Sequence, residues 1–128
     1  MSVQLNHTIV SARDPAASAA FLIEVLGLDR PPVLFGPFTG VELDNGAILD
    51  FIHDDAKIEP QHYAFLVSDG EFDQIFGRIK ERNLTYWADP AKQKEGEIYH
   101  HFGGRGVYWC DPDGHFLEVM TRPYVAKL

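Results

Sequence analysis

One pattern of residues occurs twice along this chain of 128 residues, and this internal repeat limits the possible folds more than any other feature. In each half, a histidine in an apolar run is followed seven positions later by an aspartate. Later in each half, a glycine precedes a carboxylate by four positions. The matched positions are His7 with His62, Asp14 with Asp69, Gly46 with Gly114, and Asp50 with Glu118. Equal offsets predict two copies of one folding unit.

The first half predicts a strand, a helix and three more strands. Asp14 and Pro15 favour a helix start, because Asp accepts backbone N–H bonds as a cap and Pro fits the first turn. Gly27 is a typical helix stop. Asn45-Gly46 is a strong hairpin signal between the last two strands. We therefore expect strands at 5–10, 33–35, 40–43 and 47–52, and a helix at 16–26.

The second half predicts the same order of elements. An apolar face formed by Phe72, Ile75, Phe76 and Ile79 indicates a helix that Ser68 or Asp69 caps and Asn83 ends. Strands are expected at 62–67, around 85–87, at 106–110 and at 116–121, with a turn at Asp111-Pro112-Asp113-Gly114 between the last two. The prediction is one α+β domain over 1–128, with tandem β-α-β-β-β modules at 1–58 and 59–128.

Composition narrows the classes of partner. The net charge of −8 repels phosphate backbones, which argues against nucleic acid. The acidity suits a pocket for a cation, although it also simply favours solubility. No apolar run approaches the ~20 residues of a membrane span, so no membrane partner is expected. The single cysteine, Cys110, and the lack of a recognisable signal peptide predict a reducing, cytoplasmic location.

His7, His62 and Glu118 are the candidate metal ligands. The repeat places the two histidines at equivalent positions in their first strands, and Glu118 lies in the last strand of the second half. Two imidazoles and a carboxylate suit Fe(II), Mn(II), Zn(II) or Ni(II). Three protein ligands leave positions open for water or a small-molecule substrate, as a catalytic metal requires.

At this point the sequence resembles a known family. The residues that carry the resemblance are Leu5-Asn6-His7, His62, and the run from Gly106 to Glu118. They resemble the vicinal oxygen chelate superfamily, which includes glyoxalase I, fosfomycin-resistance enzymes, bleomycin-resistance proteins and extradiol dioxygenases. The resemblance implies two modules that form a cupped mixed sheet around one divalent metal. It also implies His7, His62 and Glu118 as the ligands, in a homodimer.

One stretch is similar to the extradiol dioxygenase signature: Ile98-Tyr99-His100, Val107-Tyr108, Asp111-Pro112-Asp113-Gly114 and Glu118. In that family, the residues matching His100 and Tyr108 lie beside the bound catecholate. Most extradiol enzymes carry two such module pairs, however, and this chain has one. Fosfomycin-resistance enzymes share the tyrosine but place a threonine two residues after the first histidine, where this chain has Ile9. Fosfomycin modification therefore ranks below the other enzyme activities.

Asp50 is the first-half counterpart of Glu118. In glyoxalase I this position supplies a fourth ligand and base, but Asp is shorter than Glu by one methylene. Asp50 is therefore either a catalytic residue or a hydrogen-bonded polar residue of the cup. The polar segment 88–105 has the length of a functional lid, and within it Arg105 either binds an anionic substrate or is an ordinary surface arginine. His53 is expected in solvent, and His115 in a turn.

The sequence therefore predicts a metal-dependent enzyme, a dioxygenase or a glyoxalase-type lyase. Its substrate would chelate the metal through adjacent oxygens, and Tyr108 and His100 would donate or shuttle protons. The alternative is a metal-free protein of the bleomycin-resistance type that sequesters a cationic small molecule. Its acidic charge favours this alternative, whereas the intact ligand set favours the enzyme.

Overall fold

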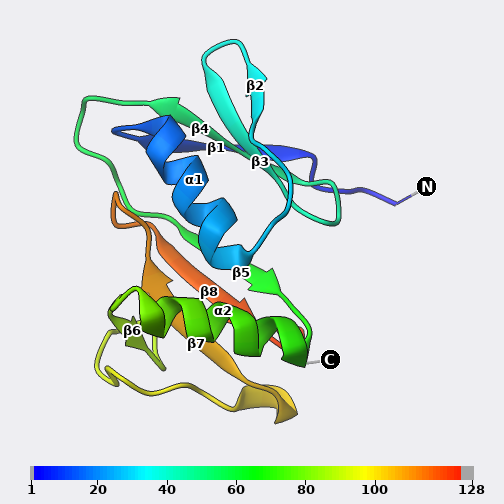
Figure 1. Cartoon of the computed structure of the whole chain (residues 1–128), viewed down its shortest axis with the longest axis vertical. Coiled ribbons are helices and arrows are strands. Elements are labelled where there is room, and N and C mark those ends of the chain that lie inside the picture. The colour runs from blue at the N-terminus through cyan, green and yellow to red at the C-terminus, as the bar shows by residue number, and fades with distance from the viewer. Residues whose placement is uncertain (1, 125–128) are drawn as a thin grey trace. The chain divides into compact units, whose positions relative to one another are not determined.

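Each half of the chain folds around its own four-stranded mixed sheet in a computed structural model that describes residues 2–124 (Figure 1). One compact unit ends at Glu59 and the other begins at Pro60, next to the expected boundary. Each unit contains a strand, a helix and three strands in chain order. The predicted α+β fold of two tandem β-α-β-β-β modules is therefore confirmed.

The first module has its strands in the order β1-β4-β3-β2. β1 runs parallel to β4, and the other neighbours are antiparallel. The Asp14 side chain accepts the N–H of Ala17 at the start of the helix, and Gly27 ends it in the left-handed conformation at φ 74°, as predicted. The elements are β1 (His7–Ala12), α1 (Pro15–Leu26), β2 (Val33–Phe35), β3 (Phe38–Glu42) and β4 (Ile48–His53).

The second module repeats this topology in the order β5-β8-β7-β6. Ser68, rather than Asp69, caps its helix, because the Ser68 side chain accepts the N–H of Glu71 while the Glu71 side chain accepts the N–H of Ser68. The elements are β5 (His62–Leu66), α2 (Asp69–Glu81), β6 (Tyr86–Trp87), the short 3-10 turn η1 (His101–Gly103), β7 (Gly106–Cys110) and β8 (Phe116–Met120).

The two faces of the second sheet differ in character. Because side chains alternate along a strand, one face carries a buried apolar set that, with the buried residues of α2, forms the module's core. That set comprises Val107, Trp109, Leu117 and Val119 from the sheet, and Phe72, Ile75 and Ile79 from the helix. The opposite face carries His62, Tyr108, Phe116 and Glu118, and we call it the site face.

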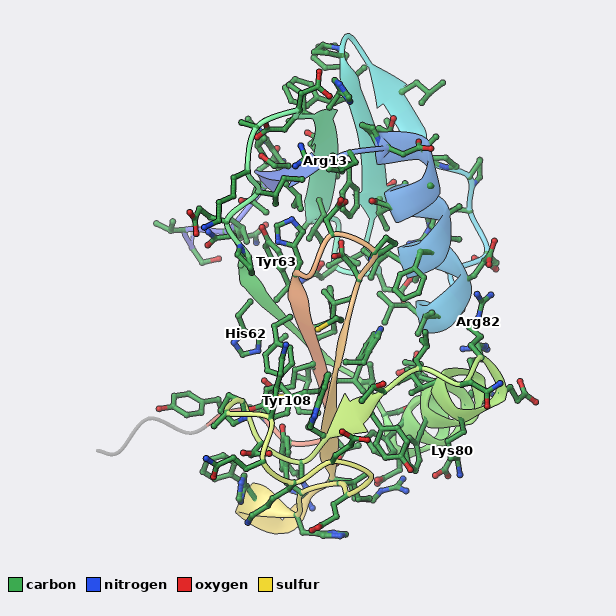
Figure 2. The ribbon with its side chains drawn as sticks, turned by 90° about the vertical axis from the view of Figure 1, so that its left-hand side faces the viewer. Arg13, His62, Tyr63, Lys80, Arg82 and Tyr108 are labelled. Carbon is green, nitrogen blue, oxygen red and sulfur yellow. The ribbon has the colours of Figure 1, made fainter. Side chains whose placement is uncertain are left out.

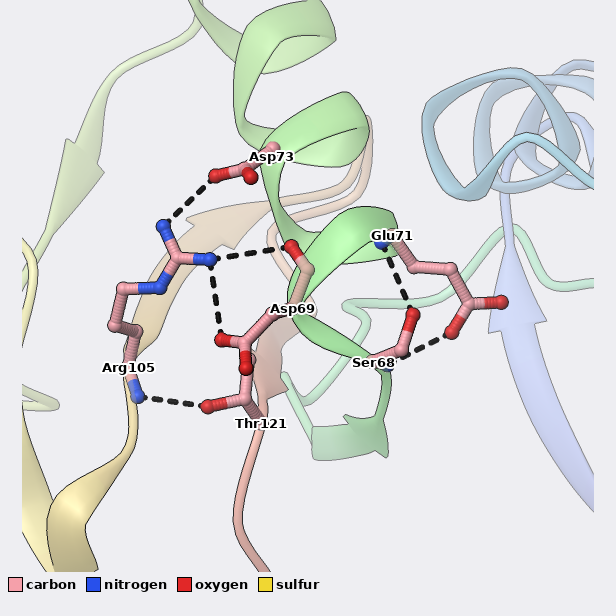
Figure 3. A network of polar contacts seen from close by, with 6 residues as sticks. All are labelled: Ser68, Asp69, Glu71, Asp73, Arg105 and Thr121. Atoms are coloured by element: carbon pink, nitrogen blue, oxygen red, sulfur yellow. Dashed lines mark hydrogen bonds and ion pairs between the residues drawn. The ribbon is translucent and has the colours of Figure 1, made fainter.

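Arg105 fixes α2 to the sheet at one end. Its guanidinium lies 2.8 Å from Asp73 and 3.2 Å from Asp69 (Figure 3). The same group lies 4.5 Å from the centre of the Phe72 ring. Its backbone N–H donates to the Thr121 hydroxyl at 2.9 Å. The sequence left two roles open for Arg105, binding of an anionic substrate or an ordinary surface position. In the structure its guanidinium is already paired with two carboxylates of α2. These contacts join the start of β7 and the end of β8 to the first turns of α2.

No helix within residues 2–124 combines the length and the apolar character needed to cross a lipid bilayer.

Candidate functional site

His62 and Glu118 form the centre of the site face. They lie on the adjacent parallel strands β5 and β8, where Glu118 is opposite Ala64 and His62 is opposite Phe116. Residues two apart along a strand share a face, so both side chains project to the same side. His62 Nε2 lies 3.0 Å from Glu118 Oε1. The imidazole is half-exposed and the carboxylate is buried, so the pair is accessible from the side of the histidine.

The turn before β8 holds this pair in register. Asp111 accepts the N–H groups of Asp113 and His115 at 2.9 Å each and pairs with His115 through the backbone. His115 lies in the turn, as predicted, but it is also buried at 1% exposure. Its Nδ1 accepts the N–H of Gln61 at 3.0 Å, which fixes the residue immediately before His62.

Tyr108 lies directly opposite Glu118 on the antiparallel pair β7 and β8. Its ring stacks on Phe116 with centroids 5.0 Å apart and lies 5.7 Å from the His62 ring (Figure 2). Burial, followed by the charge of Glu118, raises the pKa of Tyr108 to about 12. The phenol therefore keeps its proton at neutral pH, and its hydrogen bond with Glu118 contributes to this shift.

Tyr99 is a site residue that the sequence reasoning missed. Its hydroxyl donates to Glu118 Oε2, and the residue is buried. Burial first, and then Glu118, raise the pKa of Tyr99. Its neighbour His100, the predicted catalytic residue, is exposed, and its role stays a prediction. The sequence did contain one signal for this. In an extended segment, adjacent side chains point to opposite sides, so only one of Tyr99 and His100 can face Glu118.

The first module presents a different arrangement at the equivalent positions. His7 is exposed at the start of β1, with Nδ1 2.7 Å from Asn6 Oδ1. Asp50 shares its sheet face and lies opposite Gly40, as Glu118 lies opposite Tyr108. A Cβ atom at position 40 would be only 2.7 Å from Asp50 Oδ1. The first module thus has a carboxylate over a glycine where the second has a carboxylate beside a phenol.

The pair in the second module fits a divalent metal. Bonds of ~2.1 Å at a right angle place two ligand atoms about 3.0 Å apart, which matches the separation of His62 Nε2 and Glu118 Oε1. Within the described residues of either module, no three His, Cys, Asp or Glu side chains converge on one point. His7 as the third ligand stays a prediction, because it belongs to the other module. His53, expected in solvent, is exposed and lies 2.8 Å from Asp55.

The first part of the long segment 88–105 is an ordered loop at the edge of the site face. Asp89 accepts the N–H groups of Gln93 and Lys94 at 2.8 to 3.0 Å. The Lys92 ammonium lies 5.0 Å from the centre of the Trp87 ring and 5.3 Å from that of Phe116. An exposed cation therefore lies over the aromatic side chains next to Tyr108.

Comparisons with known proteins identify relatives of the whole chain. The chain is 31% identical to the glutathione transferase FosA of Serratia marcescens, over 100% of the chain and 87% of that protein. It is 26% identical to the metallothiol transferase FosB of Lysinibacillus sphaericus, over 100% of the chain and 89% of that protein. The solved structure of oxidase ChaP-H1 is 58% identical, covers 98% of this chain and 100% of its own, and gives a TM-score of 0.94.

Residues 4–119 match the family model. The match includes both modules, and with it the His62–Glu118 pair and the Tyr108 that faces it. The chain belongs to the Glyoxalase/Bleomycin resistance protein/Dioxygenase superfamily.

Proposed function

We propose that this protein is a metal-dependent oxidase that acts on a small molecule with two adjacent oxygen donors, as a cytoplasmic homodimer. The observation that carries the proposal is the site face, where a protonated phenol lies beside a buried carboxylate paired with an accessible imidazole. The 58% identity to a protein named as an oxidase supports oxidation over the other reactions of the superfamily.

His62 and Glu118 would bind the metal from the second module, and His7 would bind it from the first. The proposed ion is Fe(II), Mn(II), Zn(II) or Ni(II), and the redox-active members of this group suit oxidation best. When bound, the metal supplies Lewis-acid polarisation of the substrate oxygens. Asp50 and His100 are proposed as accessory acid–base residues, by analogy with the superfamily.

Tyr108 would act on the substrate rather than on the metal. Tyr108 lies opposite Glu118 on the site face, so its phenol can donate a hydrogen bond to a substrate oxygen that gains negative charge. The stacked ring of Phe116 holds the phenol in place. A preorganised donor of this kind stabilises charge without rearranging during the reaction.

The test is the metal content of protein purified without chelator, followed by oxygen consumption with a panel of catechols and hydroxyquinones. We expect about one divalent metal per chain, and oxygen uptake that requires both metal and substrate. Protein that contains no metal and takes up none would contradict the proposal. If such protein bound cationic drugs tightly, it would be a sequestering protein instead.

A second candidate is thiol transfer to fosfomycin, favoured by the 31% identity to FosA over the whole chain. Against it, the threonine expected in such enzymes is replaced by Ile9, which is exposed on β1 and lies opposite Asp50. An aliphatic side chain there cannot hydrogen-bond a phosphonate. Mass-spectrometric detection of a glutathione–fosfomycin adduct formed by the metal-loaded protein would establish this activity, and its absence would exclude transfer of glutathione.

A further inference from the structure

We propose that Tyr99 is a positioning residue that holds Glu118 in a one-oxygen binding mode toward the metal. The inference rests on the proposed function, because it concerns how the carboxylate presents itself as a ligand. It assigns a task to Tyr99, which belongs to no regular strand and to which the signature described above gave no role of its own.

The two oxygens of Glu118 have different surroundings. Oε2 accepts the Tyr99 hydroxyl, whereas Oε1 lies 3.0 Å from His62 Nε2. Because Oε2 accepts the Tyr99 hydroxyl and Oε1 faces the imidazole, Oε1 is the oxygen better placed to share a metal ion with His62. A hydrogen-bonded carboxylate also loses rotational freedom, so less order has to be imposed when the metal binds.

The backbone determines the position of the Tyr99 ring. Tyr99 and Gly106 exchange two backbone hydrogen bonds, of 2.9 and 3.0 Å. A Cβ atom at position 106 would collide with the Tyr99 ring, so the ring fills the space left by the missing side chain of Gly106. The His101 ring stacks on the Tyr99 ring, with their centroids 4.6 Å apart and their planes 20° from parallel. The hydroxyl is therefore aimed at Glu118 by the fold itself.

Removal of the hydroxyl alone is the first test. Tyr99→Phe keeps the ring and its packing, and Tyr86→Phe, on the opposite face of the sheet, is the matched control. Calorimetric titration with Mn²⁺ should show affinity for Tyr99→Phe about 10- to 100-fold weaker than wild type, as is usual when a partner of a metal ligand is lost. Tyr86→Phe should bind as wild type does. Circular dichroism and thermal melting check that both variants fold.

Infrared difference spectra provide a readout that a purely structural role would not change. The gap between the asymmetric and symmetric carboxylate stretches narrows when a carboxylate binds through both oxygens. In Tyr99→Phe, Oε2 is free to reach the metal, so the gap assigned to Glu118 should narrow on adding Mn²⁺. In wild type and in Tyr86→Phe it should remain wide.

A double-mutant cycle tests the contact between Tyr99 and Gly106. Gly106→Ala should displace the ring and weaken Mn²⁺ binding in the wild-type background. In a Tyr99→Ala background, the same substitution should have no further effect, because the clashing ring is gone. Additive effects in the two backgrounds would refute the steric part of the argument.

The outcomes separate this inference from the proposed function. If the wild-type protein binds none of Fe²⁺, Mn²⁺, Zn²⁺ and Ni²⁺, both are overturned. If the wild type binds Mn²⁺ and Tyr99→Phe binds it equally well with an unchanged infrared gap, the positioning role of Tyr99 is overturned and the metal-dependent function stands. Weaker binding together with the narrowed gap supports the role.

Discussion

Tyr108 and Glu118 lie directly opposite each other on two antiparallel strands, with the phenol and the carboxylate on the same face. This register follows from the turn between the strands. Asp111 and His115 pair through the backbone N–H of Asp111, which leaves the odd number of residues 112–114 as the loop. A slip of one residue would turn Tyr108 toward the core.

Tyr108→Phe should leave folding and metal content unchanged while turnover of the true substrate falls at least about tenfold. The reason is the loss of a preorganised donor to an oxyanion, while the aromatic packing on Phe116 is kept. Steady-state kinetics and metal analysis of the same preparation check this. Unchanged turnover would remove Tyr108 from the mechanism.

Glu118→Gln, His62→Ala and His7→Ala should each lose bound metal and activity, because a three-ligand site rarely survives the loss of one ligand. His53→Ala is the matched control and should change neither quantity, since His53 is bonded to Arg13 and Asp55 on the surface. Metal analysis before and after dialysis against a chelator measures the effect. If His53→Ala proved as damaging as His62→Ala, the ligand assignment would be wrong.

The pKa of His53 should be above its usual value of about 6.5. The backbone carbonyl of Arg13 contributes most, followed by the Asp55 side chain. A raised pKa in the folded state means that this contribution to stability is fully present below the unfolded pKa and is lost as pH rises through the folded pKa. NMR titration of the imidazole gives the value. Asp55→Asn should lower it, and a wild-type value at or below the usual one would be inconsistent with this pairing.

His115→Leu should destabilise the fold by about 1–3 kcal/mol, because the N–H of Gln61 loses its acceptor in a part-buried setting. Urea denaturation followed by circular dichroism measures the change. His100→Ala, at an exposed position, should stay within about 0.5 kcal/mol of wild type. Equal stabilities for the two variants would show that His115 does not stabilise the turn.

The superfamily resemblance predicts a homodimer. Light scattering of the purified protein at micromolar concentration should give twice the chain mass of 14.4 kDa. A clean monomer mass at that concentration would refute the prediction.

The repeat made most of the fold predictable, because hydrophobic period, caps and turn residues all act locally. Asp14, Gly27 and the apolar face of the second helix are examples. The repeat and the family resemblance singled out His62 and Glu118 as ligands, which stays a prediction; the structure adds that they lie 3.0 Å apart on adjacent strands. Tyr99 did not follow, because its contact with Glu118 depends on a loop crossing over Gly106. Such a path depends on tertiary packing, and no short sequence pattern encodes it.

The sequence did not predict that His115 is buried, and it left the role of Arg105 open, for a related reason. Both depend on partners far along the chain, Gln61 for the first and Asp69 and Asp73 for the second. A polar residue in a turn or loop looks the same in the sequence whether it faces solvent or a distant strand.

Gly40 and Tyr108 occupy the same place in two copies of one module, and their difference has an evolutionary consequence. Selection at position 40 would act on shape, because almost any side chain there collides with Asp50. Selection at position 108 would act on chemistry, because phenylalanine should pack there as tyrosine does and should lower only the turnover of the enzyme. In a deep mutational scan, position 40 would appear among the sites that limit abundance, and position 108 among those that limit activity at normal abundance. The same place in the module thus carries a steric constraint in one copy and a polar, potentially reactive group in the other.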